Sequence, residues 1–254
     1  MKRIVLSGCN GHMGQVISRS VSERDDCKIA AGIDLNTESP FGYPVYQSAA
    51  EITEEVDVLI DFSHVSVLTS ILQYATEKKI PVVLCTTGYT QEQVEELKEA
   101  SKKIPVFYSR NMSLGINLLV ALSKKAAQIL GDQFDIEIVE KHHNQKIDAP
   151  SGTALMIADG ICDALQEEMH YVYDRHSQRK KREKNEIGLH AIRGGTIVGE
   201  HEVIFAGHHE TITLSHSAQT KDLFAIGAIN AALFLVSGEQ KPADLYDMSS
   251  MIQD

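Results

Sequence analysis

Residues 3–14 read RIVLSGCNGHMG, a short apolar run followed by three glycines spaced three residues apart. The run Arg3–Ser7 predicts a buried strand, and the segment Met13–Glu23 predicts the helix that follows it. Glycines between a strand and a helix allow a tight turn and let a pyrophosphate approach the helix N-terminus closely. The stretch therefore predicts a Rossmann-like parallel sheet whose first loop binds a dinucleotide, with a purely structural turn as the alternative.

An acidic residue stands where such a loop needs one. Asp34 ends a second predicted strand, Lys28–Ile33, twenty residues after Gly14. A carboxylate at this place accepts hydrogen bonds from the hydroxyls of an adenosine ribose. Two further loops follow predicted strands, and ligands of open α/β sheets bind outside the carboxyl ends of strands. The predicted cofactor-binding residues are Gly8, Cys9, Asn10, Gly11, His12, Met13, Asp34, Cys85, Thr86, Thr87, Arg110, Asn111, Met112 and Ser113.

The first part of the chain alternates short apolar runs with amphipathic segments, which is typical of βαβ units on a parallel sheet. Continuous Val, Ile and Leu content without alternation indicates strands that are buried on both faces. Further strands are predicted at Val56–Phe62, Pro81–Cys85 and Pro105–Tyr108, and helices at about Ser66–Lys78 and Gln91–Lys103.

The pattern changes after Asn111. Helices are predicted at Leu114–Leu130 and Ala154–Leu165, an alternating strand at Asp135–Glu140, and an antiparallel meander at Leu189–Ile192, Thr196–Ala206 and Glu210–Ser217. The apolar helix Leu223–Val236 must be buried and is expected to pack back on the first domain. The predicted fold class is α/β, with a Rossmann-like dinucleotide-binding domain (1–113 with 221–254) and a mixed α+β domain for substrate binding and oligomerisation (114–220).

The most informative segment for chemistry is EKHHNQKIDAPSGTA, residues 140–154. It places His142, His143 and Lys146 within five residues and then enters a helix for which Ser151 is a natural N-cap. Free amides in the first helical turn bind a small carboxylate, and a histidine moves protons near neutral pH. The segment therefore favours a small anionic substrate that undergoes proton transfer, although a lone histidine is more often a plain solvated loop residue.

No metal site is predicted, because adjacent histidines point in different directions and no third ligand is suitably spaced. Four histidines of the predicted meander are expected at the surface or in an interface: His201, His208, His209 and His216.

Together these motifs resemble the dihydrodipicolinate reductase family over essentially the whole chain. The resemblance lies in Gly8–Gly14 with Asp34, Thr86–Gly88, Asn111–Gly115, Glu140–Ala154, Arg193–Gly195, Val198–His201 and Phe224–Leu235. It implies an NADH- or NADPH-dependent reduction of 4-hydroxy-tetrahydrodipicolinate to tetrahydrodipicolinate, in lysine and diaminopimelate biosynthesis, by a homotetramer. It also implies that His142 is a proton donor and acceptor and Lys146 a proton donor, while His143 with the Gly152 and Thr153 amides holds the substrate carboxylates.

The chain departs from the family pattern at positions that bear on the cofactor. Members that use NADPH well often carry Arg where this chain has His12 and Leu35. Without those guanidiniums a 2′-phosphate lacks its bidentate partners, and Asp34 repels it. We therefore expect NADH to be preferred, with NADPH still usable. Asn230 stands where many relatives have Arg.

Composition sets limits on partners and location. The 254 residues carry a formal net charge of −11, which disfavours nucleic acid and anionic membrane as partners. No segment approaches the ~20 apolar residues of a membrane span, and the scattered cysteines fit reduced, buried side chains, so a cytoplasmic location is expected. The basic run 175–184 is expected to be a solvated, mobile loop, with attraction of the dianionic substrate as a weaker alternative.

Two other functions compete with this prediction. One is another Rossmann dehydrogenase with a small carboxylic substrate, such as an aspartate or semialdehyde dehydrogenase. A semialdehyde dehydrogenase uses a cysteine nucleophile, and no cysteine here lies in a plausible strand-to-helix elbow with a nearby base. The other is a non-catalytic dinucleotide sensor, which would keep Gly8–Gly14 and have no use for His142 and Lys146.

Overall fold

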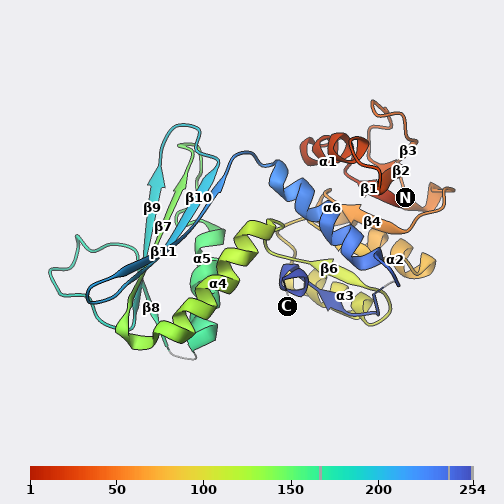
Figure 1. Cartoon of the computed structure of the whole chain (residues 1–254). Helices are drawn as coiled ribbons and strands as arrows, with labels where there is room; N and C mark the ends of the chain where they lie inside the picture. Colours follow the sequence, from red (N-terminus) through yellow and green to blue (C-terminus); the bar gives the residue numbers. More distant parts are fainter. Residues whose placement is uncertain (166–167, 240, 253–254) are drawn as a thin grey trace. The chain divides into compact units, whose positions relative to one another are not determined.

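The computed structural model describes residues 1–165, 168–239 and 241–252. The chain divides into two compact units, Met1–Ser113 with Asp222–Asp254, and Leu114–Lys221 (Figure 1). The second boundary lies one residue from the place expected from the sequence. Within the described ranges, no helix is long and apolar enough to cross a membrane.

The first unit is built on a seven-stranded sheet in the order β12-β6-β5-β4-β1-β2-β3, and every neighbouring pair is parallel. Two edge strands were not predicted, because two residues are too few to show a periodicity. The strands are β1 (Lys2–Ser7), β2 (Cys27–Ile33), β3 (Val45–Tyr46), β4 (Val58–Asp61), β5 (Val82–Leu84), β6 (Val106–Tyr108) and β12 (Leu245–Tyr246).

Helices cover both faces of this sheet, as a doubly wound fold requires. The core on one face contains Leu6 with residues of α1 (His12–Ser22) and α6 (Asp222–Val236), so the predicted return of the last helix to the first unit is confirmed. The core on the other face contains Val5 with residues of α2 (Leu68–Lys78) and α3 (Gln91–Ser101). Successive β1 side chains therefore lie in opposite cores. Short 3-10 turns occur at Ala49–Glu51, Val65–Val67 and Met248–Met251.

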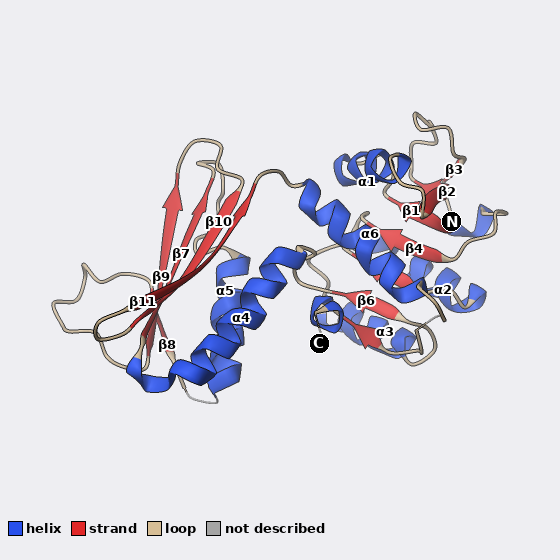
Figure 2. Cartoon of the chain, in the orientation of Figure 1, coloured by secondary structure: helices blue, strands red, loops and turns tan. Residues whose placement is uncertain are grey.

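The second unit is a five-stranded sheet in the order β11-β10-β7-β9-β8, with α4 (Leu114–Leu130) and α5 (Gly152–Leu165) on one face (Figure 2). Its strands are β7 (Asp135–His142), β8 (His170–Val172), β9 (Glu186–Arg193), β10 (Gly199–Ala206) and β11 (Thr211–Ala218), and a 3-10 turn (Gly131–Gln133) follows α4. Side chains of β7 alternate between the buried, helix-facing side and the open side of the sheet. The buried row begins with Ile136 and Ile138 and ends with Glu140 and His142.

The predicted antiparallel meander is correct only for its second half. β10 and β11 form an antiparallel hairpin, but β9 pairs in parallel with β7, and β7 lies between β9 and β10. Period-2 patterning identifies a strand and its buried face, and it carries no information about which strand becomes its neighbour.

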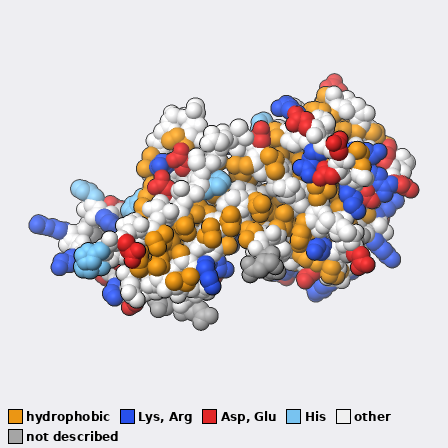
Figure 3. Space-filling view, in the orientation of Figure 1, with side chains coloured by type: hydrophobic (Ala, Val, Ile, Leu, Met, Phe, Trp, Pro, Cys, Tyr) orange, Lys and Arg blue, Asp and Glu red, His pale blue; other side chains and the backbone are white. Residues whose placement is uncertain are grey.

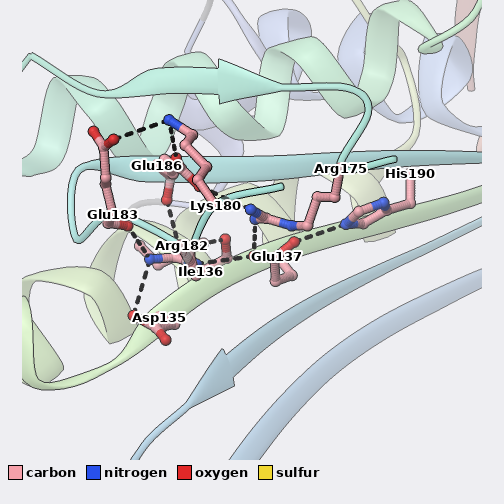
Figure 4. A network of polar contacts seen from close by, with 9 residues as sticks. All are labelled: Asp135, Ile136, Glu137, Arg175, Lys180, Arg182, Glu183, Glu186 and His190. Atoms are coloured by element: carbon pink, nitrogen blue, oxygen red, sulfur yellow. Dashed lines mark hydrogen bonds and ion pairs between the residues drawn. The ribbon is translucent and has the colours of Figure 1, made fainter. Parts of the chain in front are cut away.

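The basic run 175–184 is largely exposed, as expected of a solvated loop, but several of its cations pair with carboxylates (Figure 4). Arg175 donates to Glu186 at 2.8 Å and to Glu137 at 2.6 Å, and Arg182 donates to Glu137 at 3.0 Å. Lys180 lies 3.3 Å from Glu186, whose side chain is only 2% exposed. The acidic partners stand on β7 and β9, so the charge run considered alone could not reveal them.

Candidate active site

The loop after β1 has the geometry of an anion-binding turn. Gly8 has φ +76°, and a Cβ there would lie 2.6 Å from the carbonyl oxygen of Phe62. A Cβ on Gly14 would lie 2.2 Å from the carbonyl oxygen of Gly8, so α1 packs directly on the loop. Gly11 is the N-cap of α1 and places no side chain over the first turn. The amides of that turn are therefore available to an anion.

Asp34 organises the edge of this loop. Its Oδ2 accepts from the amide of Asn10 at 3.0 Å, and its Oδ1 accepts from the amide of Asn36 at 3.2 Å. The Asn10 side chain donates to the carbonyl oxygens of Asn36 at 2.6 Å and Glu38 at 2.9 Å. Beside these residues lies a cavity of about 370 Å³, lined by Asn10, Gln15, Asn36, Glu38, Ser39 and Pro40. The cavity is of a size that holds part of a nucleotide.

Not every predicted cofactor residue presents its side chain at this edge. Cys9 is fully buried, and burial raises the pKa of its thiol to about 11. Cys85 belongs to the same core, and burial raises its pKa well above the usual value. Only the backbone of these two residues is available to a ligand. His12 is exposed and Met13 is half-buried.

A buried carboxylate that the sequence analysis missed supports the loop after β5. Asp61 ends β4, is fully buried and accepts a hydrogen bond from the Thr86 hydroxyl at 2.9 Å. Its other oxygen accepts from the Ser63 amide at 3.3 Å. The signal was present, since Asp61 stands near the end of a predicted strand much as Asp34 does. Thr87, next to the anchored Thr86, is exposed.

The loop after β6 is also ordered from within. The Asn111 side chain accepts from the amide of Ser113 at 2.8 Å, and Met112 and Ser113 are buried whereas Arg110 is exposed. Because β1, β5 and β6 run parallel in one sheet, the three predicted cofactor loops lie at the same edge.

In the second unit, Glu140 and His142 form a buried pair at the end of β7. Glu140 Oε2 lies 2.6 Å from His142 Nδ1, and the Glu140 side chain is 1% exposed. Arg193, at the end of β9, donates to both carboxylate oxygens at 2.7 Å. Burial alone would raise the pKa of Glu140, but hydrogen bonds from Arg193, His142 and the Ser151 amide outweigh it and lower the pKa. Glu140 is therefore ionised at neutral pH.

The start of α5 is connected to this pair. The Ser151 amide donates to Glu140 Oε1 at 3.0 Å, and the Ser151 hydroxyl accepts from the amide of Ala154 at 3.1 Å, as an N-cap does. Gly152, the first residue of the helix, is exposed, and a Cβ there would meet nothing within 4 Å. The Gly152 amide interacts with the Asp148 carboxylate and contributes to its lowered pKa, so a small anion at the first turn of α5 would take the place of that carboxylate.

His201 corrects the expectation that the histidines of the predicted meander and its turns lie at the surface or in an interface. It is 4% exposed, its Nε2 lies 3.1 Å from the Ser151 hydroxyl, and its ring centroid is 5.2 Å from that of His142. Burial lowers its pKa to about 4, so the ring is neutral at physiological pH. His216, its neighbour on β11, is half-buried, while His208 and His209 are exposed as expected. Alternation in β10 puts His201 on the helix-facing side with Val203 and Phe205.

Lys146 and His143 lie in the loop between β7 and α5, and both are half-buried. The Lys146 ammonium is 2.8 Å from Asp148 Oδ1, and this contact lowers the pKa of Asp148. The loop is held to the turn that follows β9, because the Asn144 amide donates to the carbonyl oxygen of Gly195 at 3.2 Å. One unit therefore gathers every predicted catalytic and substrate-binding residue. Among the described parts of the chain, no group of three or more His, Cys, Asp or Glu side chains is arranged to hold a metal ion.

The chain has a doubly wound sheet with a glycine loop, and a second mixed unit that carries a buried histidine–carboxylate pair. This combination defines the class of two-domain, dinucleotide-binding oxidoreductases. Family models described as dihydrodipicolinate reductase, N-terminus, and dihydrodipicolinate reductase, C-terminus, match residues 2–112 and 115–252. The chain belongs to the dihydrodipicolinate reductase family.

Individual relatives agree with this assignment. The chain is 52% identical to a 4-hydroxy-tetrahydrodipicolinate reductase of Caldanaerobacter subterraneus subsp. tengcongensis, over 100% of this chain and 99% of the relative. A 4-hydroxy-tetrahydrodipicolinate reductase of Clostridium tetani is 49% identical over 99% and 97% of the two chains. The fold matches that of a dipicolinate-bound dihydrodipicolinate reductase from Paenisporosarcina sp. TG-14, with a TM-score of 0.82, 22% identity and full coverage of both chains. The chain is thus an NAD(P)H-dependent oxidoreductase, which sets aside the sensor and the other dehydrogenases.

Proposed function

We propose that this chain reduces 4-hydroxy-tetrahydrodipicolinate to tetrahydrodipicolinate with NAD(P)H, in lysine and diaminopimelate biosynthesis. The observation that carries the proposal is the contact of the buried Glu140–His142 pair with the exposed start of α5, with Lys146 in the connecting loop. The names of the curated relatives support the reaction, and the dipicolinate bound to the Paenisporosarcina relative supports a small aromatic dicarboxylate as ligand.

In the second unit, some residues bind the substrate carboxylates and others transfer protons. The amides of Gly152 and Thr153, at the positive end of α5, hold a substrate carboxylate together with His143. Lys146 donates a proton to the reduced substrate, and His142 accepts and returns a proton. NAD(P)H, when bound, would supply the hydride that takes the place of the hydroxyl lost as water from ring carbon four.

In the first unit, the loop Gly8–Gly14 holds the pyrophosphate and Asp34 the adenosine ribose, because the loop offers amides and Asp34 offers acceptor oxygens. The loops after β5 and β6 flank the nicotinamide end. The proposed cofactor-binding residues remain those predicted: Gly8, Cys9, Asn10, Gly11, His12, Met13, Asp34, Cys85, Thr86, Thr87, Arg110, Asn111, Met112 and Ser113. For Cys9 and Cys85 the contact is through the backbone.

The function is tested by following oxidation of the reduced nicotinamide when substrate is made freshly from pyruvate and aspartate semialdehyde. We expect steady oxidation above the rate of a blank without substrate, and competition by dipicolinate. Binding of NADH and dipicolinate without any turnover would show that the proposed reaction is wrong.

We propose further that NADH is preferred over NADPH. Leu35, next to the ribose carboxylate, is 88% exposed and offers no charge to a 2′-phosphate, while Asp34 and Glu38 surround the same place with negative charge. A charge-assisted hydrogen bond contributes about 1.5–3 kcal/mol, so we expect kcat/KM for NADH to exceed that for NADPH by roughly tenfold or more.

The double variant His12→Arg/Leu35→Arg tests whether the missing guanidiniums cause the expected preference for NADH. The double variant should raise kcat/KM for NADPH by about tenfold, because two guanidiniums supply bidentate partners for the phosphate. The value for NADH should change little. A wild-type ratio that favours NADPH, or a double variant with an unchanged ratio, would contradict the proposal.

A homotetramer and a cytoplasmic location complete the proposal. α4 exposes an apolar stripe, seen along this helix in Figure 3, in which Leu118 is 45% exposed, Leu122 47% and Ile129 70%. Apolar surface of this kind is commonly covered by a partner in oligomers. Neither nucleic acid nor membrane is expected as a partner.

A further inference from the structure

We propose that Glu140 and Arg193 are positioning residues that hold the His142 imidazole in one tautomer, with its proton on Nδ1 and its lone pair on Nε2. The inference deepens the proposed function, in which His142 takes part in proton transfer, and it rests on that function for its catalytic consequence. The arrangement lies within the second unit.

The carboxylate of Glu140 is saturated with donors. Oε1 receives the Ser151 amide at 3.0 Å and an Arg193 nitrogen at 2.7 Å. Oε2 receives the other Arg193 nitrogen at 2.7 Å and faces His142 Nδ1 at 2.6 Å. Arg193 is a permanent donor, and the lowered pKa of Glu140 is consistent with this environment. The carboxylate is therefore ionised and can only accept hydrogen bonds.

The ionised Glu140 carboxylate determines the tautomer of His142. Because Glu140 has no proton to give, the hydrogen bond at 2.6 Å requires the proton on Nδ1. The neutral ring then carries its lone pair on Nε2, the atom that can take up a proton. No hydrogen bond joins Nε2 to another residue in the described ranges, so this atom is left for a ligand.

Arg193 keeps the frame rigid. Besides its two bonds to Glu140, it donates to the carbonyl oxygens of Asp148 at 2.7 Å and Ile192 at 2.8 Å. A bidentate guanidinium with two backbone anchors allows the carboxylate little rotation. Because Glu140 also holds the Ser151 amide, the same carboxylate connects the imidazole to the first turn of α5, where we place the substrate carboxylate.

The charges around His142 come from every element packed against it. Glu140 and Arg193 neutralise each other, and His201 on β10 is a neutral neighbour with a pKa of about 4. His201 in turn lies within electrostatic range of His216 on β11 and of Lys146. Glu140 is therefore the anion nearest to an imidazolium formed at His142.

The first test is made on the wild-type chain by nitrogen NMR, with histidine carrying the heavy nitrogen isotope and the His142 signals assigned by their loss in His142→Gln. We expect Nδ1 to be protonated and Nε2 to be unprotonated in the neutral ring. The opposite tautomer would overturn the inference, whatever the enzyme assay gives. Absence of turnover with the correct tautomer would instead count against the proposed function.

The second test is Glu140→Gln, which keeps the shape and removes the charge. We expect kcat to fall by ~10²–10³-fold, the lower part of the ~10²–10⁴-fold range of general acid–base contributions, while KM changes only a few-fold. The acidic limb of the kcat profile should move to lower pH, because an imidazolium loses its carboxylate partner. A purely structural role would lower the amount of folded enzyme without moving this limb.

Glu140→Asp and Glu200→Gln complete the experiment. Aspartate keeps the charge and should restore part of kcat and the wild-type pH profile, and it remains informative if Glu140→Gln leaves Arg193 unpaired and does not fold. Glu200, on the open side of the same sheet, pairs with Lys141 at 3.0 Å, so its change to Gln is a matched control and should leave kcat unchanged. Equal kcat and equal pH profiles for wild type and Glu140→Gln would overturn the inference.

Discussion

Replacement of Lys146 by Ala is expected to lower kcat by ~10²–10⁴-fold, the contribution of a well-placed general acid. Lys146 is the lysine of the loop between β7 and α5, its side chain is only 22% exposed, and its ammonium lies 2.8 Å from Asp148 in the free chain. NADH should still bind, because the proposed cofactor loops belong to the other unit. Stopped-flow turnover and NADH fluorescence titration measure the two effects separately.

Two further variants separate proton donation from simple charge. Lys146→Arg keeps a positive charge that cannot be given up as a proton, so kcat should stay low if Lys146 is the donor. Recovery of kcat in this variant would mean that the lysine acts only by attracting the substrate. Lys103→Ala makes the same change at an exposed site of the first unit and should behave as wild type. Wild-type kcat in Lys146→Ala would remove the lysine from the mechanism.

The parts of the fold that were predictable are those governed by local periodicity. The helix Leu114–Leu130 was predicted to the residue. The strands predicted to begin at Arg3 and Lys28 begin one residue earlier, at Lys2 and Cys27. These segments are long enough for an apolar pattern to specify both the element and its buried face. The insertion of β7 between β9 and β10 was not predictable, since the register of strand pairing depends on contacts that the pattern of one strand does not contain.

The candidate site shows the same division. The stretch around His142 and Lys146 could be recognised because its residues are consecutive, whereas Arg193 reaches Glu140 from 53 positions away. His201 was expected at the surface or in an interface, although it shares a row of β10 with Val203 and Phe205, so the alternation of this strand could have identified its buried face. Its burial follows from the register in which β10 pairs with β7, opposite Glu140. Pairing across strands thus supplies the groups that support the reactive residues.

Gly14→Ala is expected to give the second large effect, the loss of tight NADH binding. The added Cβ would lie 2.2 Å from the Gly8 carbonyl oxygen and 2.6 Å from backbone atoms of Cys9, and backbone cannot move aside as a flexible side chain does. Overpacking of this kind costs about 1–3 kcal/mol. With about 2–4 °C per kcal/mol for a chain of this size, Tm should fall by several degrees. The dissociation constant for NADH should rise by about tenfold or more, as 1.4 kcal/mol corresponds to tenfold.

Gly11→Ala is the matched control in the same loop. Its Cβ would lie 3.3 Å from the Gly8 carbonyl oxygen, a distance that a shift of a few tenths of an ångström relieves. Tm should therefore stay close to that of the wild-type chain, while NADH affinity still falls, because the methyl group covers the amides at the start of α1. Thermal unfolding and calorimetric NADH titration of both variants distinguish packing from ligand contact. Unchanged NADH affinity in both variants would mean that this loop does not hold the pyrophosphate.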